Sequence, residues 1–296
     1  MKIFKRVLLV TLILGALLIG TGIVMGASFE DLINVVISDD KYIKQDDIMI
    51  SDNIENVSIS MSSRPLVIFE SEDKNYIQYY LYEEKETINF SEENQTLTFS
   101  LKEKPLKFPW ISVGIASSYV STVYLYLNSS TLKSLDINIS SGSVRIDYSK
   151  HIDSVNINLS SGSLNVEEIK TKKLTYNSSS GSFNAKNIES DETTIDISSG
   201  SVKIDSITGE KLIIEISSGS IKVLDSIVTN TKIKGSSSSV TIYDKRSKDL
   251  IGFSAKTSSG SIKIFDNSYK EKSDDKNKYD IYYDISISSG SIKIYN

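Results

Sequence analysis

Hydrophobic and polar residues alternate along most of this chain, and the alternation is interrupted at regular intervals by Ser-Ser-Gly-Ser. The segment "ISSGSVKI" (197–204) is one instance, and close copies stand at residues 139–146, 159–166, 216–223, 257–264 and 287–294. Alternation with a period of two is typical of β-strands that bury one face. The pattern therefore predicts two short strands in each copy, joined by a four-residue corner.

The copies recur at nearly constant spacing. The corner glycines are Gly142, Gly162, Gly181, Gly200, Gly219, Gly260 and Gly290, and Ser238 takes the glycine place in one further copy. Successive intervals are 20, 19, 19, 19, 19, 22 and 30 residues. A short fixed period indicates a solenoid, because one strand pair cannot bury its apolar face without stacked neighbours. We predict an all-β, right-handed parallel β-solenoid with coils of about 19 residues. An antiparallel meander of hairpins with Ser-Gly turns is the alternative.

Positions before and after a corner are counted from its glycine, or from Ser238 in that place. The second and fourth residues after each corner are apolar or small in every copy, which predicts a continuous core. They are Val144 and Ile146, Leu164 and Val166, Phe183 and Ala185, Val202 and Ile204, Ile221 and Val223, Val240 and Ile242, Ile262 and Ile264, and Ile292 and Ile294. The corner serines recur in equivalent places, whereas a catalytic serine is needed once and beside a base. The only histidine is His151, and no G-x-S-x-G elbow occurs, so we interpret the serines as structural.

The two ends of the repeat are less regular. Residues 57–70, "VSISMSSRPLVIFE", resemble an imperfect copy of the repeat with Arg64 in the glycine place. Pro65 lacks a backbone N–H donor, which predicts an end coil near a sheet edge. We therefore expect irregular capping coils over 50–130 and regular coils over 131–296. Asn296 directly follows a strand pattern, so we expect either self-association through the C-terminal coil or a cover formed by the charged loop at 267–280.

The N-terminal segment is long enough to cross a membrane. Residues 7–25 carry no charge, and Lys2, Lys5 and Arg6 precede them. This pattern predicts a single-pass transmembrane anchor over residues 1–27, a linker over 28–49 and an extracytoplasmic solenoid over 50–296. A cleaved signal peptide is the alternative.

Composition removes several classes of function. The chain lacks cysteine, which excludes disulfides and thiolate metal sites, and the calcium-loop spacing is missing. Its formal net charge of −5 gives no global basic field, so we predict no nucleic-acid partner. No catalytic residue, metal or cofactor is predicted.

The corners "SSGSVRI", "SSGSVKI" and "SSGSIKI", the lead-in "VYLYLNSSTLKSLDINISSGS" and the basic-flanked N-terminal apolar segment resemble a known group. It is the bacterial "putative adhesin" domain family of unknown function, a β-helix-like strand repeat, and the resemblance covers residues 50–296. The resemblance implies adhesion at the cell envelope. The family has no established functional residues to carry over.

Outward positions hold the candidate chemistry. The third residue after the corner is basic at Arg145, Lys203, Lys222, Lys263 and Lys293, which we name the basic stripe. This stripe suits an anionic polymer such as teichoic acid, or a phospholipid surface, and it equally suits a solvated face with edge-protecting lysines.

Two other sets of side chains are weaker candidates. Asp147, Glu167 and Asp205 form an acidic column interrupted by Lys186, and paired carboxylates are what polysaccharide enzymes need. Tyr76, Tyr79, Tyr80 and Tyr82 suit either stacking on sugars or packing.

The sequence as a whole predicts a non-catalytic, envelope-associated binding or scaffold protein that is adhesin-like. Its expected partners are the membrane, through the N-terminal helix, and an anionic wall polymer or a membrane protein. A β-helix enzyme acting on cell-wall or environmental polysaccharide is the alternative function. A mechanical spacer is a third possibility.

Overall fold

Parallel strands wind into stacked coils in the computed structural model, which describes residues 42–104, 121–128 and 132–296. The strands are β1 (Ile43–Lys44), β2 (Ile48–Ile50), β3 (Asn56–Ser63), β4 (Leu66–Glu70), β5 (Asn75–Gln78), β6 (Tyr80–Leu81), β7 (Glu86–Glu93), β8 (Thr96–Glu103), β9 (Val123–Leu127), β10 (Ser134–Ser141), β11 (Val144–Val223), β12 (Ser226–Tyr243), β13 (Ile251–Ile264), β14 (Asn267–Tyr269), β15 (Glu271–Ser273) and β16 (Ile281–Tyr295). Two short 3-10 helices, η1 (Lys248–Leu250) and η2 (Lys276–Lys278), lie in the last connections.

The expected membrane span at residues 7–25 lies outside the described residues. Among the residues that are described, no helix has the length and apolar character needed to cross a bilayer. Strand β1 lies within the stretch expected to be a linker, β2 begins in it, and β2 pairs with β5.

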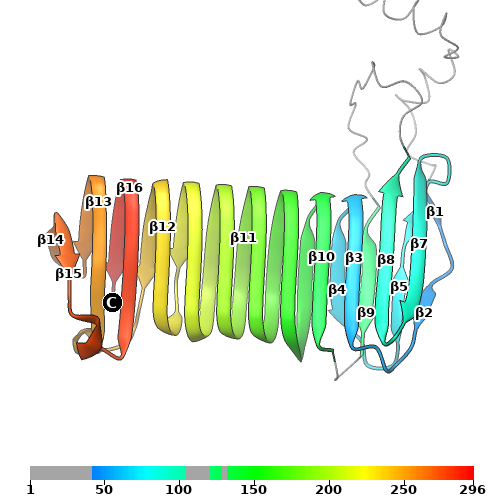
Figure 1. Cartoon of the computed structure of the whole chain (residues 1–296), viewed down its shortest axis with the longest axis horizontal. Coiled ribbons are helices and arrows are strands. Elements are labelled where there is room, and N and C mark those ends of the chain that lie inside the picture. Colours follow the sequence, from blue (N-terminus) through cyan, green and yellow to red (C-terminus); the bar gives the residue numbers. More distant parts are fainter. Residues whose placement is uncertain (1–41, 105–120, 129–131) are drawn as a thin grey trace, which may run out of the picture. The chain divides into compact units, whose positions relative to one another are not determined.

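The regular repeats form a parallel solenoid and not a meander. The long strand β11 runs through several successive coils, which appear in green and yellow in Figure 1. Strand β11 pairs in parallel with β10 on one side and with β12 on the other. The corners lie in register, with Ser141 opposite Ser161 and Ser218 opposite Ser237. Like residues therefore stack on like residues, as the spacing predicts. The right-handed sense stays a prediction.

The predicted inward columns form the core. All the apolar residues named for the second and fourth positions after the corners are at most 4% exposed. Burial of a large aliphatic side chain stabilises a fold by about 1.5–3 kcal/mol, so the repeated columns provide the main stabilising term. This core fills the interior of each coil, and it leaves the outward columns to interact with solvent or a ligand.

The corner glycines are required by the close approach of neighbouring coils. Gly200 has a φ of 149°, which side chains with a Cβ rarely adopt. A Cβ on Gly200 would lie 1.6 Å from the carbonyl oxygen of Gly181 in the adjacent coil. The glycine column is thus a consequence of backbone stacking, which supports the structural interpretation of the corner.

Ser238 shows how one coil tolerates the loss of this glycine. Its side chain is 4% exposed and points inward, into space left by Gly235. A Cβ on Gly235 would lie 2.0 Å from the Ser238 Oγ. Gly235 occupies a position that is isoleucine in the two adjacent coils, because it lies in register with Ile216 and Ile287. A glycine three residues earlier therefore compensates for the serine.

The coil formed by β3 and β4 is not the end coil, so that expectation is wrong. Strand β3 lies between β8 and β10, and β4 lies between β9 and β11, all in parallel. Pro65 follows the last paired residue of β3 and precedes β4, so its missing N–H costs no ladder hydrogen bond. Arg64 is 1% exposed and forms a buried ion pair with Glu86 and hydrogen bonds to Ser121.

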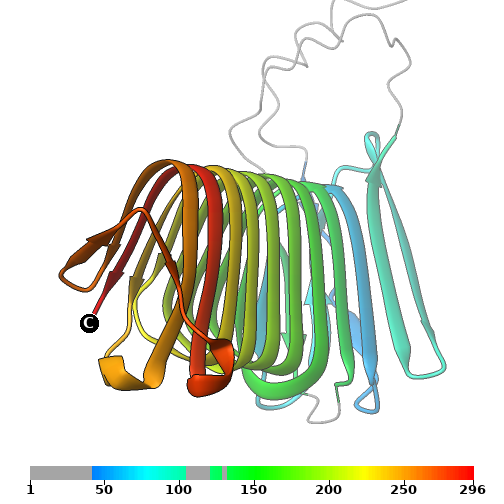
Figure 2. The same cartoon turned by 60° about the vertical axis from the view of Figure 1, so that its left-hand side comes forward.

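The C-terminal strand is also not at the end of the stack, which corrects the expectation of an open C-terminal coil. Strand β16 pairs in parallel with β12 on one side and β13 on the other. Figure 2 shows the orange β13 outside the red β16. The charged loop does cover an edge, but the edge is that of β13, against which β14 and β15 run antiparallel. The last coil in the sequence is therefore inserted between two earlier ones.

A buried polar cluster fastens the inserted coil to β12. Asp244 is fully buried, accepts a hydrogen bond of 2.6 Å from the Tyr283 hydroxyl and forms an ion pair of 2.7 Å with Arg246. The side-chain amide of Asn296 donates to the carbonyl oxygens of Asp244 and Arg246, both at 2.7 Å. Burial alone would raise the pKa of Asp244, but the hydrogen bonds from Arg246 and Tyr283 outweigh it and lower that pKa.

We expect Asp244→Asn to cost about 1.5–3 kcal/mol at pH 7, the usual range for hydrogen bonds to a charged group. Because the folded pKa lies below the unfolded value of about 3.9, the carboxylate stabilises the fold above about pH 4. That contribution is lost as the pH falls through the folded pKa. Thermal unfolding at pH 7 and pH 3 should therefore show a gap between variant and wild type that shrinks in acid. The exposed Asp249→Asn is the control, and a gap unchanged at pH 3 would contradict the assignment.

Candidate functional site

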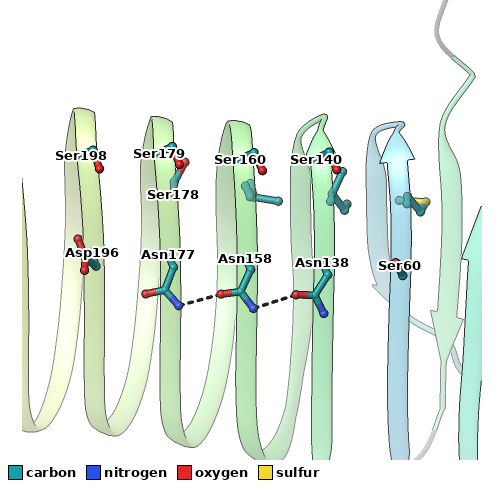
Figure 3. A pocket seen from close by; sticks show the side chains of 13 residues that line it. Ser60, Asn138, Ser140, Asn158, Ser160, Asn177, Ser178, Ser179, Asp196 and Ser198 are labelled. Atoms are coloured by element: carbon teal, nitrogen blue, oxygen red, sulfur yellow. Dashed lines mark hydrogen bonds between the residues drawn. The ribbon is translucent and has the colours of Figure 1, made fainter. Parts of the chain in front are cut away.

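A shallow polar groove of about 390 Å³ runs across five coils on the strands that precede the corners (Figure 3). We name it the Asn–Ser groove. Two outward columns form its walls, and the buried Met61, Ile139 and Leu159 lie between them. The polar lining residues are Ser60, Asn138, Ser140, Asn158, Ser160, Asn177, Ser178, Ser179, Asp196 and Ser198.

The asparagines of the groove form a hydrogen-bonded ladder. The Nδ2 of Asn177 donates to the Oδ1 of Asn158 at 2.8 Å, and the Nδ2 of Asn158 donates to the Oδ1 of Asn138 at 3.0 Å. Each amide carries two N–H donors and an oxygen with two lone pairs, so the ladder uses only part of its capacity. The ladder holds the amides in one orientation and leaves a repeating set of donors and acceptors toward solvent.

The serine wall adds one hydroxyl for each coil. Ser140, Ser160, Ser179 and Ser198 are all exposed and lie side by side at the rim in Figure 3. A hydroxyl both donates and accepts. Only Asp196 among the lining residues is charged, and the next acid along the column, Glu215, is ion-paired with Lys234 at 2.8 Å. The groove thus suits an uncharged, extended ligand rich in hydroxyl or amide groups.

The sequence contains the pattern that forms this groove, although sequence reasoning alone did not identify the groove as a site. The fourth residue before the corner is asparagine in three successive copies, at Asn138, Asn158 and Asn177. Equal residues at one place of a stacked repeat lie next to each other, which is what makes the ladder.

The basic stripe lies on the strands that follow the corners, on the other side of the corner from the Asn–Ser groove. The structure changes which members of the stripe are neighbours. Lys263 lies in register with Lys293, Lys293 with Thr241, and Thr241 with Lys222. Insertion of β16 therefore brings Lys293 between Thr241 and Lys263, contrary to the sequence order. Arg145 is separate, because it lies in register with Val67 and forms an ion pair with Glu167 at 3.6 Å.

Two members of the acidic column, Glu167 and Asp205, form ion pairs with neighbouring cations. Glu167 lies 2.5 Å from Lys186 and 3.6 Å from Arg145, and Asp205 lies 2.9 Å from Lys203. The hydrogen bond from Lys186 is the main cause that lowers the pKa of Glu167, opposite to the raised pKa of a general acid. These carboxylates therefore have a charge-balancing role, and the described residues contain no cluster of three metal-ligating side chains.

The single histidine does not assemble a serine triad. The side chain of His151 is 54% exposed, and its Nε2 lies 3.3 Å from the Oδ1 of Asp153. The hydroxyl of each corner serine instead belongs to a column of equivalent hydroxyls, as in the 3.0 Å contact between the Oγ atoms of Ser182 and Ser201.

The tyrosines divide between core and surface. Tyr79 and Tyr82 are buried at 8% and 7% exposure, which confirms packing for these two, and Tyr80 is half-buried. Tyr76 is also half-buried and stacks on Tyr126, with ring centroids 4.3 Å apart. Because stacked rings cover each other's faces, this arrangement first of all packs the outer face of the sheet.

Comparison with known structures shows the same fold in bacterial proteins. A "putative adhesin" from Parabacteroides distasonis is 14% identical with a TM-score of 0.55, and the match covers 86% of this chain and 98% of that one. A "putative lipid binding protein" from the same species is 20% identical with a TM-score of 0.53, over 87% and 98%. A "putative adhesin" from Bacteroides fragilis is 13% identical with a TM-score of 0.51, over 86% and 97%.

The curated proteins contain no match to this chain. Residues 54–295 match the family described as Toastrack DUF4097, a domain of unknown function, so the family-level expectation from the corner motifs is confirmed. Since that match spans most of the sequence, the chain belongs to the Toastrack DUF4097 family.

Proposed function

We propose that this protein is a non-catalytic, adhesin-like binding protein of the cell envelope, and that it holds an extended, uncharged polysaccharide along the Asn–Ser groove. The observation that carries the proposal is the row of identical amides and hydroxyls repeated coil by coil over the groove. A polymer with a repeating unit engages such a row at several places at once. Weak contacts then add up through effective concentration.

Three further features support this choice. The solved structures of similar fold carry binding-protein names, two of them adhesins. The groove is polar, which favours a hydroxyl-rich ligand over an acyl chain. The uncharged segment at residues 7–25 with its basic flank supports a single-pass anchor with the solenoid outside the cell.

The alternative of a polysaccharide-cleaving enzyme has less support. Such an enzyme needs two carboxylates at a set separation beside its groove. The Asn–Ser groove has one, Asp196, and Glu167 and Asp205 of the acidic column, on the other side of the corner, are held in ion pairs. We therefore propose binding without turnover.

We expect Ser160→Tyr to block the groove. Ser160 is exposed at the middle of the serine wall, where a phenol ring would fill the space beside Asn158 and Asn177. The matched control is Ser258→Tyr, at the equivalent place of β13 and outside the groove. Full-length protein in mild detergent would be co-sedimented with purified peptidoglycan stripped of attached anionic polymers. At least tenfold weaker binding is expected for Ser160→Tyr, and a change of less than twofold for the control.

Unfolding curves of both variants would show that the fold is intact. Absence of wild-type binding to the stripped peptidoglycan would overturn the proposal, as would equal binding by the two variants. Release of soluble fragments from the polymer would instead support the enzyme.

A further inference from the structure

Cations in the third position after the corner are charge-balanced in one half of the solenoid. Arg145 lies 3.6 Å from Glu167, and Lys203 lies 2.9 Å from Asp205. The counter-charges come from the fifth position after the corner, on the same outward face, which carries a carboxylate at Asp147, Glu167 and Asp205. Lys203 pairs with Asp205 of its own strand, whereas Arg145 pairs with Glu167 of the neighbouring coil.

The other half lacks these carboxylates. The fifth position after the corner is Leu224, Tyr243, Tyr295 or Phe265 in the last four coils. The lysines Lys222, Lys263 and Lys293, which we name the lysine row, are exposed, and none of them forms a salt bridge within the part of the chain that the structure describes. Cations at the same place elsewhere have a partner, so the lysine row stands out.

The lysine row carries an electrostatic cost within the protein. Lys263 and Lys293 lie directly opposite each other on adjacent parallel strands, and like charges in that position destabilise a sheet. Thr241 separates Lys293 from Lys222 and offers a hydroxyl between them. On one side the row borders the corner serines, and on the other side Tyr243 and Tyr295 stack with ring centroids 4.9 Å apart. A bound polyanion would remove this repulsion.

We propose that the lysine row binds the phosphate groups of a linear phosphodiester polymer that lies along the axis of the solenoid. Ammonium and hydroxyl groups are donors to phosphate, and the row presents them at intervals of about 4.8 Å per coil. The row is one residue wide and lies between the corner serines and the fifth-position residues Leu224, Tyr243, Tyr295 and Phe265, which fits a single extended chain. A bilayer surface would be met by a broader basic face.

This inference rests on the proposed binding role but not on the Asn–Ser groove, which lies on the other side of the corner. The two sites would take different polymers, one uncharged and one anionic. Three lysine contacts within one chain act together by effective concentration, so loss of all three should have more than an additive effect on binding.

The test uses full-length protein in mild detergent and immobilised linear poly(glycerol phosphate). The variant K222Q/K263Q/K293Q removes the row, and K172Q/K211Q/K245Q removes three exposed, ion-paired lysines elsewhere with the same change of net charge. At least tenfold weaker binding is expected for the first variant and less than twofold for the second. The slope of log K against log salt should also fall by about 2, at roughly 0.7 per lost phosphate contact, the value for single-stranded nucleic acid.

Three controls separate this inference from its rivals. K222R/K263R/K293R should keep the affinity, and Ser160→Tyr should bind the poly(glycerol phosphate) normally even if it loses peptidoglycan binding. Equal binding by the two glutamine variants would overturn the inference, since it would show a non-specific charge effect. Row-dependent binding to vesicles of anionic phospholipid without binding to the polymer would overturn it in favour of a membrane surface.

Discussion

Removal of residues 281–296 is expected to unfold the C-terminal coils and not merely to shorten the solenoid by one coil. Strand β16 is the partner of both β12 and β13, so its loss leaves two facing edges with no strand between them. It also removes seven large buried side chains, Ile281, Tyr282, Tyr283, Ile285, Ile287, Ile292 and Ile294. At about 1.5–3 kcal/mol each, this loss is on the order of 10 kcal/mol, comparable with the whole stability of a typical domain.

The loss of β16 also breaks the polar cluster at Asp244. Without the Tyr283 hydroxyl, the buried carboxylate keeps only Arg246 among its side-chain partners in the described structure, and the backbone carbonyl oxygen of Asp244 loses the Asn296 amide. A buried charge with fewer hydrogen bonds is costly. We therefore expect β12, β13 and the short strands on β13 to lose order together.

Limited proteolysis and thermal unfolding by circular dichroism would measure this effect. Cleavage is expected within 226–280 of the truncated chain, where the full chain is protected. The matched control deletes residues 181–199, one full 19-residue period, so that Ser180 precedes Gly200 and no new unpaired edge is created in the stack. The insertion would be wrong if the truncated chain were as protected as the full chain, or if the internal deletion did equal damage.

Gly200→Ala is expected to cost at least about 3 kcal/mol, well beyond an ordinary substitution. The new Cβ would lie 1.6 Å from the Gly181 carbonyl oxygen, and that atom is backbone, so no side-chain rotation relieves the contact. The φ of 149° adds strain for any residue with a Cβ. The two coils must separate locally or the corner must change its conformation.

The neighbouring Ser199→Ala is the control for this substitution. Ser199 is exposed, and exposed substitutions away from special features change stability by about 0.5 kcal/mol or less. Urea unfolding of both variants would give the comparison. Similar midpoints for Gly200→Ala and wild type would show that the corner can relax, and the glycine column would then need another explanation.

The Asn–Ser groove and the basic stripe differ in whether the sequence alone predicts which of their residues are neighbours. The asparagine column is within one uninterrupted run of 19- and 20-residue periods, so its adjacency follows from counting. The pairing of Lys263 with Lys293 does not, because it depends on which coil the last strand joins. The charge balance of Arg145 likewise needs coordinates, since the ion pair with Glu167 forms between neighbouring coils.

The amino-acid sequence by itself determined the coil period, the inward columns and the corners. These features depend on local alternation and on a steric need that recurs in every copy, as at Gly200. Only the tertiary structure decided the order of the coils at both ends. Strand β3 lies between β8 and β10, which both come later in the sequence, and β16 lies between β12 and β13, which both come earlier. The physical reason is that similar repeats present nearly equivalent edges. The periodic pattern then cannot specify the neighbour, and longer connections such as the one before Gly290 allow a strand to reach a more distant place.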